Sequence, residues 1–362
     1  MRLGVGVGVV KCLHHRSKMT NICPMNNQTR SITTMSVSDI NENLFRRRTT
    51  TPDNRYYSNN NNNYKKKMTT NNNKASVTIF PDLETATAQI LIVDESTKQC
   101  AILDSVLNYT VASGRTSTTS IDKLLAVIEE KGYKVQWVLE SHIHADHLSA
   151  AHYIKSKYPD ARSAIGEGAK KVQQTFKHIY NLGHDFPVDG SQFDQLWKDG
   201  ETFQIGSLNV RVIHTPGHTP ACVSYYIVDD CLFVGDTMFM PDVGTARCDF
   251  PDGSAVTLYE SMQKLLALPE STDVYVCHDY PPAGREIGFK TTIGEQRKLN
   301  KHIKDGITRE EFIEMRTTRD ATLKAPNLLL PSIQVNVRAG ELPKAEDNGI
   351  SYLKIPLNFL KQ

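Results

Sequence analysis

A run of seven residues, from Ser141 to His147, reads Ser-His-Ile-His-Ala-Asp-His and brings three imidazoles and one carboxylate together. It follows the mostly apolar run Val135–Leu139, so we expect a buried strand with these side chains on the loop at its end. Protonatable groups this close repel one another and are costly to bury unless something shares them. Because imidazole nitrogen and carboxylate oxygen suit zinc, iron or manganese, a shared metal ion explains the run better than a solvated histidine-rich loop does.

The same arrangement, an apolar strand followed by a polar side chain, returns three times downstream. His218 follows the alternating run 208–212 and a Pro-Gly turn that can project it into a cleft, while His214 fits a structural role as well as a ligand role. Asp236 and His278 each end a further apolar run. Side chains on strand-end loops over a rigid sheet are held well enough for catalysis. The candidate ligands for one or two metal ions are His142, His144, Asp146, His147, His218, Asp236 and His278.

Hydrophobic periodicity and turn residues predict the elements that carry these motifs. We expect strands at 87–93, 100–106, 135–139, 222–228, 231–234 and 274–280, with two more within 202–214. We expect helices at 121–132, 149–157, 169–179, 256–266, 291–304 and 309–316, then a loop-like stretch through Pro331. Clusters of strands with helices between them favour an α/β fold of two packed sheets with helices outside.

Residues 1–75 differ in composition from the rest of the chain. Asparagine and lysine tracts between residues 59 and 73 have little apolar surface to bury, so we expect disorder there. No acidic residue precedes Asp39, which is compatible with a mitochondrial transit peptide or with a basic extension that carries no targeting signal. The remainder suits one domain at 76–290 and a C-terminal helical and loop appendage at 291–362 that packs on it.

Composition argues against several classes of protein. The 42 basic and 40 acidic residues give a net charge of +2, and the basic start has no interleaved aromatic residues, so we expect no nucleic-acid partner. The apolar run Leu3–Val10 is too short to span a membrane, and we expect no membrane partner. Seven scattered cysteines without C-x-x-C spacing argue against a disulfide scaffold and favour a reducing compartment, the mitochondrial matrix or the cytoplasm.

Taken in order, the motifs His-x-His-x-Asp-His, Thr-Pro-Gly-His-Thr, Gly-Asp and a strand-end histidine resemble the metallo-β-lactamase superfamily over roughly residues 76–290. Within it the chain looks most like the glyoxalase II branch, and there most like the persulfide dioxygenases, including the bacterial β-lactamase-like hydrolase type. The segments that carry this likeness are 235–250, 278–286, 332–336 and 352–358. The resemblance implies an αβ/βα sandwich of two mixed sheets with outer helices.

The resemblance to persulfide dioxygenases implies one Fe(II) per chain, held by His142, His218 and Asp236. Two histidines and one carboxylate with open positions are the recognised pattern for oxygen activation by non-haem iron. Such enzymes oxidise glutathione persulfide to sulfite and glutathione in sulfide detoxification. The four other candidate ligands would then orient the iron ligands by hydrogen bonds.

The resemblance to glyoxalase II implies a different site with two Zn(II) per chain and a thioester hydrolase, hydroxyacylglutathione hydrolase. Asp236 would bridge the metals, with His142, His144 and His218 on one and Asp146, His147 and His278 on the other. We favour the dioxygenase because of the loop at 237–250 and because the tail is shorter than in a typical glyoxalase II. A third class is a noncatalytic metal-binding protein.

Two residues are candidates for contact with the substrate. Arg247 can pair with a carboxylate of a glutathione-like thiol persulfide or thioester, or can instead shape its loop by pairing with Asp242 or Asp249. Tyr280 can contact the substrate or pack in the cavity wall. The expected partner is this small molecule, and a homo-oligomer is possible.

Overall fold

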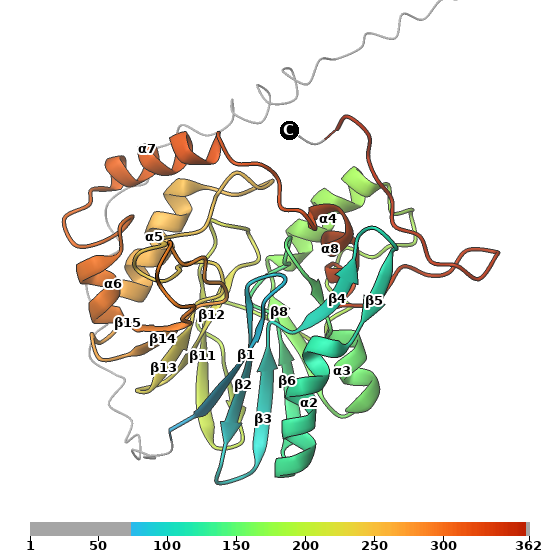
Figure 1. The fold of residues 1–362 in the computed structure, drawn as a ribbon, viewed down its shortest axis with the longest axis horizontal. Helices are drawn as coiled ribbons and strands as arrows, with labels where there is room; N and C mark the ends of the chain where they lie inside the picture. The colour runs from blue at the N-terminus through green and yellow to red at the C-terminus, as the bar shows by residue number, and fades with distance from the viewer. Residues whose placement is uncertain (1–73, 360–362) are drawn as a thin grey trace, which may run out of the picture. The chain divides into compact units, whose positions relative to one another are not determined.

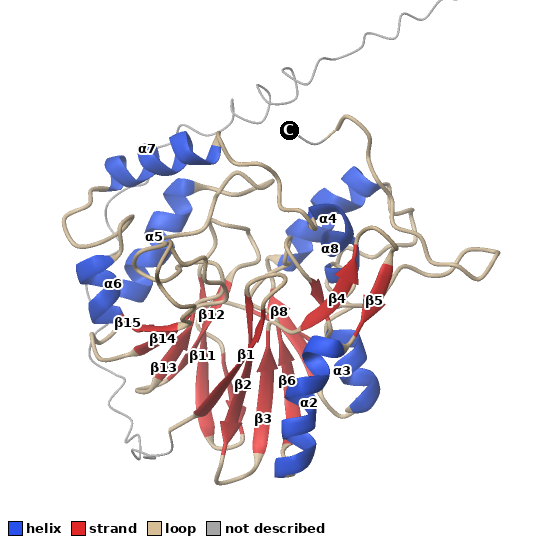
Figure 2. Ribbon diagram, viewed as in Figure 1, coloured by secondary structure: helices blue, strands red, loops and turns tan. Residues whose placement is uncertain are grey.

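The computed structural model describes residues 74–359, which belong to one compact unit. The predictions for residues 1–75 therefore fall almost entirely outside the described residues. Two six-stranded mixed sheets form the centre of the fold, with helices on their outer sides (Figures 1 and 2). This architecture confirms the predicted α/β sandwich of two mixed sheets.

The first sheet carries the His-rich motif at the end of one of its inner strands. Its strands, in spatial order, are β1 (Ser76–Asp82), β2 (Thr87–Asp94), β3 (Gln99–Leu103), β6 (Lys134–Leu139), β8 (Arg162–Gly166) and β9 (Gln195–Trp197). The first three pair antiparallel, and β3, β6, β8 and β9 pair parallel. Parallel strands present their carboxyl ends at the same edge, which places the residues after β3 and β6 side by side.

The second sheet carries the other predicted ligands. Its strands, in spatial order, are β10 (Thr202–Ile205), β11 (Leu208–His214), β12 (Val223–Ile227), β13 (Cys231–Phe233), β14 (Asp273–Tyr275) and β15 (Lys290–Thr292). Only the pairing of β13 with β14 is parallel. A third, small antiparallel sheet contains β5 (Arg115–Ser117), β4 (Val106–Thr110) and β7 (Leu148–Ser149).

The helices cover the outer faces of the two large sheets. They are α2 (Thr119–Lys131), α3 (Ala151–Lys157), α4 (Ala169–Tyr180), α5 (Ala255–Leu266), α6 (Ile293–Leu299), α7 (Arg309–Asp320) and α8 (Leu329–Asn336). Figure 1 shows α2 and α3 beside the first sheet and α5, α6 and α7 beside the second. Gly132 ends α2 in the left-handed conformation, as its position after the last apolar residue predicts.

Alternation along β2 shows how the layers pack. Ile90 and Ile92 join the cluster between the two sheets, whereas Leu91 and Val93 face the cluster that contains α2 and α3. Every residue of β2 is buried because both of its faces are covered. Residues after 290 also belong to the core. Ile303 and Phe312 join the cluster between the two sheets, Val335 joins the cluster that contains α2 and α3, and Ile333 joins a third cluster. The proposed boundary near residue 290 stays a prediction.

The structure corrects several predicted elements. The strand expected at 100–106 is broken by Asp104, whose φ of +53° turns the chain out of β3 and into β4. The helix expected at 291–304 ends at Leu299, and the helix expected to end at 316 continues to Asp320. The expected loop through Pro331 contains the start of α8, because proline is tolerated in the first helical turn.

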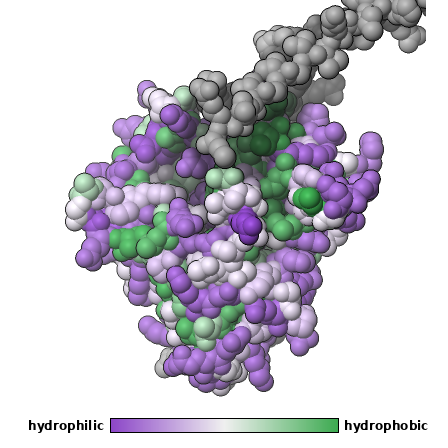
Figure 3. All heavy atoms as spheres, turned by 45° about the vertical axis from the view of Figure 1, so that its right-hand side comes forward, coloured by the Kyte–Doolittle hydropathy of each residue, from purple (hydrophilic) through white to green (hydrophobic). Residues whose placement is uncertain are grey.

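The surface drawn in Figure 3 is largely hydrophilic, with smaller hydrophobic patches between the polar side chains. Among the described residues, no helix is both long and apolar enough to cross a membrane.

Candidate metal centre

The loops after β6, β11, β13 and β14 bring the predicted ligands to one place. An isolated bridge between Thr87 and His278 ties the loop after β14 to the start of β2 in the first sheet. Gly235 has a φ of +51°, and a Cβ there would lie 2.6 Å from the Ser141 side chain. Glycine is therefore required where the loop before Asp236 approaches the His-rich loop.

His142, His218 and Asp236 form one group whose ligating atoms all lie within 4.8 Å of one another. Nε2 of His142 and of His218 lie 4.0 and 3.7 Å from Asp236 Oδ2. Metal bonds of about 2.0–2.2 Å place two ligand atoms of one ion roughly 3–4 Å apart. The three side chains therefore have the spacing of a shared metal site.

Hydrogen bonds fix the orientation of both imidazoles in this group. His218 Nδ1 donates to the carbonyl oxygen of Arg247 at 2.8 Å, and His142 Nδ1 lies 3.0 Å from the hydroxyl of Ser141. Each bond occupies Nδ1 and leaves Nε2 turned toward Asp236. Such outer contacts hold a ligating ring in place before the metal arrives.

A second group contains His144, His147, Cys277 and His278, again with ligating atoms within 4.8 Å. Asp146 joins it through His278, whose Nε2 lies 3.0 Å from Asp146 Oδ2. The same nitrogen lies 3.5 Å from Asp236 Oδ1. The two oxygens of Asp236 thus face the two groups separately.

A cation fits this centre because the buried ligand atoms lack other partners. Nε2 of His142 and His147, Nδ1 of His144 and Oδ1 of Asp236 find no hydrogen-bond partner among the described residues. An unsatisfied buried polar group costs about 1–3 kcal/mol, so several together need an explanation. Burial, followed by the charge of His144, lowers the pKa of His142 far below its ordinary value and that of His147 to about 3. These rings are therefore neutral, which is the form that binds metal.

His144 is held by two carboxylates that the sequence analysis missed. Its Nε2 lies 3.0 Å from Asp104 and 3.2 Å from Glu140. Burial alone would lower the pKa of His144, but the charges and hydrogen bonds of these acids raise it well above its ordinary value. Asp104 follows the apolar strand β3, so the strand-then-polar pattern used for the other ligands could have found it.

Asn336, at the end of α8, is a second residue that the analysis missed. Its Nδ2 donates to the carbonyl oxygens of His144 and His147 at 2.9 and 2.8 Å, and its Oδ1 accepts from the backbone N–H of Ser149 at 2.8 Å. This one buried side chain therefore links the backbone of His144, His147 and Ser149. Its tail segment was noted for its likeness, but nothing local marks the asparagine itself.

A buried ion pair within α7, between Arg316 and Asp320, fixes the loop beside His218. Arg316 Nη1 donates to the carbonyl oxygen of Thr245 at 3.0 Å, and Asp320 Oδ2 accepts from the N–H of Cys248 at 2.7 Å. These two bonds fix the backbone on either side of Arg247, whose carbonyl oxygen accepts the hydrogen bond from His218 Nδ1. Helix α7 contains none of the candidate ligands, but it orients the loop that holds one of them, His218.

The side chain of Arg247 already has partners. Its Nε and Nη2 donate to Asp249 at 2.6 Å, its Nη1 donates to the carbonyl oxygen of Lys324 at 2.6 Å, and it lies over the ring of Phe250. This is the loop-shaping role that we weighed, with Asp249 rather than Asp242 as the partner. Contact with substrate stays a prediction for Arg247.

A cavity of about 650 Å³ opens at the centre and is lined in part by Asp146, His218, Asp236, Arg247 and Tyr280. Its size suits a small molecule. Tyr280 is 49% exposed and stacks on the ring of His278, with centroids 5.8 Å apart. Both roles considered for Tyr280 are compatible with this position.

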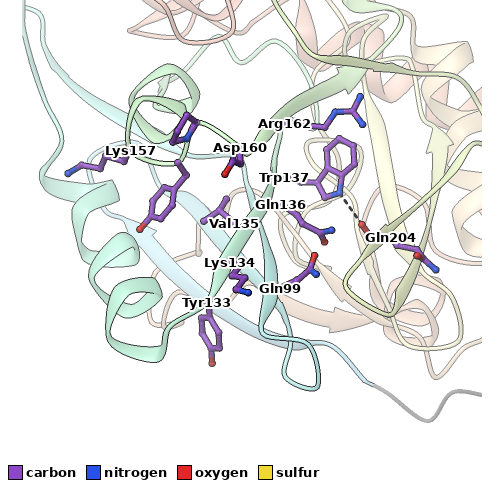
Figure 4. A pocket seen from close by; sticks show the side chains of 12 residues that line it. Gln99, Tyr133, Lys134, Val135, Gln136, Trp137, Lys157, Asp160, Arg162 and Gln204 are labelled. Atoms are coloured by element: carbon purple, nitrogen blue, oxygen red, sulfur yellow. Dashed lines mark hydrogen bonds between the residues drawn. The ribbon is translucent and has the colours of Figure 1, made fainter.

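A second cavity, of about 690 Å³, lies at the opposite end of β6 and contains none of the candidate ligands. Figure 4 shows Gln136 and Trp137 there, with Trp137 Nε1 bonded to the carbonyl oxygen of Gln204. His214 also lies away from the centre, since its Nε2 is 2.9 Å from the carbonyl oxygen of Trp197. This position fits the structural role considered for His214 and not the ligand role.

Comparison with known proteins identifies the family. Residues 85–278 match the metallo-beta-lactamase superfamily. A Dictyostelium discoideum protein named glyoxylase B2 is 71% identical over 289 residues, which cover 80% of this chain and 99% of that protein. Human mitochondrial persulfide dioxygenase ETHE1 is 27% identical over 259 residues, which cover 71% of this chain and 85% of that protein.

A solved structure agrees with these sequence matches. The crystal structure of ETHE1 from Myxococcus xanthus has a TM-score of 0.58 and 28% identity, and the match covers 74% of this chain and 100% of that one. The family model and this solved structure thus agree on the fold. The chain therefore belongs to the metallo-β-lactamase superfamily of metal-binding enzymes.

Proposed function

We propose that the chain is an iron(II)-dependent persulfide dioxygenase that acts on glutathione persulfide or a similar low-molecular-mass thiol persulfide. The observation that carries the proposal is the group of His142, His218 and Asp236, a two-histidine, one-carboxylate set beside the cavity. Iron bound there would supply oxygen activation at the positions that three protein ligands leave open. The likeness to ETHE1 supports the same reaction.

The balanced reaction converts a persulfide RSSH, dioxygen and water into the thiol RSH and sulfite, with release of two protons. The S–S bond breaks, the terminal sulfur is oxidised and dioxygen is reduced. Glutathione persulfide has the terminal sulfur at the middle of an extended molecule with two carboxylates. A cavity of about 650 Å³ has room for such a molecule beside His218 and Asp236.

Two observations favour a second candidate, a dinuclear zinc thioesterase of the glyoxalase II type. The two oxygens of Asp236 face His218 and His278 separately, as a bridging carboxylate would. The name of the Dictyostelium relative also points to a glyoxalase. Against it, Asp146 is the only side chain of the second group among the described residues that lines the cavity, whereas the first group contributes both His218 and Asp236.

The deciding experiment is metal analysis of full-length protein purified without oxygen, followed by two assays. We expect one iron per chain and uptake of dioxygen with glutathione persulfide, with sulfite as product. Two zinc ions per chain and hydrolysis of a hydroxyacyl thioester of glutathione, without oxygen uptake, would replace the dioxygenase by the thioesterase. Turnover of neither substrate would favour the noncatalytic class.

The mitochondrial matrix and the cytoplasm stay proposals for the location of the protein. The human relative is named as mitochondrial, and the basic, acid-poor start of this chain is compatible with import. A fluorescent fusion that carries residues 1–45 tests the idea. A diffuse cytosolic signal would favour the cytoplasm.

A further inference from the structure

Arg285 links two of the loops that carry proposed ligands. It lies on the loop after β14, which contains His278, and its side chain reaches Asp242 on the loop after β13, which contains Asp236. Arg285 is not part of the cavity wall, whereas Asp242 is. Any effect of this arginine on a bound molecule therefore has to pass through its neighbours.

Every N–H of the Arg285 guanidinium has an acceptor. One edge donates from Nη1 and Nη2 to the two oxygens of Asp279, at 2.7 and 2.6 Å. The other edge donates from Nε and Nη2 to the two oxygens of Asp242, at 2.5 and 3.1 Å. The remaining N–H, on Nη1, donates to the carbonyl oxygen of Glu286 at 2.9 Å. Because the guanidinium is planar and rigid, these bonds fix the two carboxylates relative to each other.

Asp279 is the acid that depends most on this contact. It directly follows His278, it is 1% exposed, and it also accepts from the backbone N–H of Gly288 at 2.7 Å. A buried carboxylate needs partners of this kind. Arg285 supplies the counter-charge for Asp279 and, through Asp242, 43 residues away in the chain, ties the loop of His278 to the loop after β13.

Two aromatic side chains meet across the same two loops. Phe239 belongs to the loop of Asp236 and Tyr280 to the loop of His278, and their ring centroids lie 5.9 Å apart at an angle of 89°. Both rings line the cavity, and Tyr280 also stacks on His278. Because Tyr280 is 49% exposed, packing holds its ring on one side only. The backbone beside Asp279 therefore decides where this ring lies.

We propose that Arg285 is a positioning residue whose bridge between Asp242 and Asp279 holds Tyr280 against Phe239 and so shapes the cavity wall that substrate meets. A guanidinium is required, since an ammonium group cannot present two edges to two carboxylates. The positioning role holds for either reaction considered above, and only its effect on turnover rests on the proposed function.

Fluorine NMR of full-length protein that contains 3-fluorotyrosine follows the position of Tyr280 directly. The protein is loaded with zinc, which has no unpaired electrons, and Tyr280→Phe identifies the resonance. Arg285→Lys keeps a counter-charge for Asp279 but cannot span both acids, and Asp242→Ala leaves no buried charge unpaired. We expect the Tyr280 resonance to shift or broaden in both variants. An unchanged resonance in both would overturn the proposal.

Arg297→Gln is the matched control. Arg297 also bridges two acids, Asp305 and Glu270, but it is not part of the cavity wall. The Tyr280 resonance should stay where it is in wild type. A general effect of losing an arginine with two ion pairs would appear in this variant as well.

Calorimetry on the same zinc-loaded protein measures binding of S-methylglutathione, which has no persulfide to oxidise. We expect Arg285→Lys and Tyr280→Ala each to weaken binding about three- to tenfold, as for loss of an aromatic contact. The double variant should bind no more weakly than either single variant, because both changes act through one ring. No loss in Arg285→Lys, or losses that multiply in the double variant, would contradict the link between Arg285 and Tyr280.

The outcomes separate this inference from the proposed function. If the resonance and the affinity change as expected but iron-loaded protein consumes no oxygen with glutathione persulfide, the positioning role stands and the dioxygenase fails. If oxygen uptake is present and Arg285→Lys changes neither the resonance nor KM for glutathione persulfide, the dioxygenase stands and the positioning role fails.

Discussion

The two groups of candidate ligands share one carboxylate but differ in how freely they face the cavity. In the group of His142, His218 and Asp236, one hydrogen bond fixes each ring at Nδ1, and His218 and Asp236 line the cavity. In the other group, His144 is clamped by acids and His278 is directed at Asp146. Both groups contain imidazoles, yet only the first combines fixed rings with open access.

This difference suggests a division of labour. A reacting centre needs oriented ligands together with room for substrate, which the first group has. The second group, whose histidines contact their own carboxylates, is suited to holding the first group in place, or to binding a second metal that would hold it more firmly. Among the predictions below, His218→Ala and His147→Ala each change one group alone.

The largest effect should come from His218→Ala. It removes one of three proposed iron ligands, so we expect loss of both iron and oxygen uptake. His214→Ala is the control, because His214 lies close in sequence but its side chain hydrogen-bonds only the carbonyl oxygen of Trp197 among the described residues. Elemental analysis of both variants decides the point, and a fully loaded His218→Ala would remove the first group from the proposal.

Asn336→Ala should unsettle both groups together, since it leaves two carbonyls and one N–H of the His-rich loop without their partner. At about 1–3 kcal/mol for each buried unpaired group, we expect the free energy of unfolding to fall by about 3 kcal/mol or more. Denaturant unfolding measures it. Asn348→Ala removes an exposed side-chain contact and should stay within about 0.5 kcal/mol of wild type.

His147→Ala changes the second group alone. Under the dioxygenase proposal, the protein should keep its iron and lose activity roughly 10- to 100-fold, as outer partners of metal ligands do. Metal content and oxygen uptake are measured on the same sample. Loss of half of a two-metal load would instead give the second group a ligand role.

The smallest effect should come from Arg247→Ala. Asp249 already offsets its charge, so a substrate carboxylate would gain only a modest hydrogen bond, about 0.5–1.5 kcal/mol. We expect KM for glutathione persulfide to rise roughly three- to tenfold with iron retained. Equal losses for charged and uncharged persulfides would show that Arg247 serves only its loop.

The parts of this site that the sequence predicted are local in the chain. Apolar alternation marks the strands, and a polar residue at the strand end marks a candidate ligand, so His142, His218, Asp236 and His278 could be proposed without the fold. The sheets then bring these ends together, as parallel pairing of β3 and β6 requires.

The parts that the sequence did not predict depend on contacts between distant segments. Glu140 looks like any acid before a loop until the fold places it on His144, and Arg247 looks free until Lys324 approaches from 77 residues away. Pairing decides the role of each of these side chains, and pairing is a property of the tertiary structure.

The hydrogen bonds from Asn336 to the His-rich loop also affect when the metal centre can form in the cell. His147 precedes Asn336 by 189 residues, so at about 5–20 residues per second the His-rich loop exists for roughly 10–40 s before its clamp is synthesised. All the proposed ligands leave the ribosome before the residue that closes the loop. We expect metal to be retained by completed chains and lost from nascent chains arrested before residue 336, as metal analysis of arrested complexes would show. Metal loading would then be among the last steps of biosynthesis rather than a seed for folding.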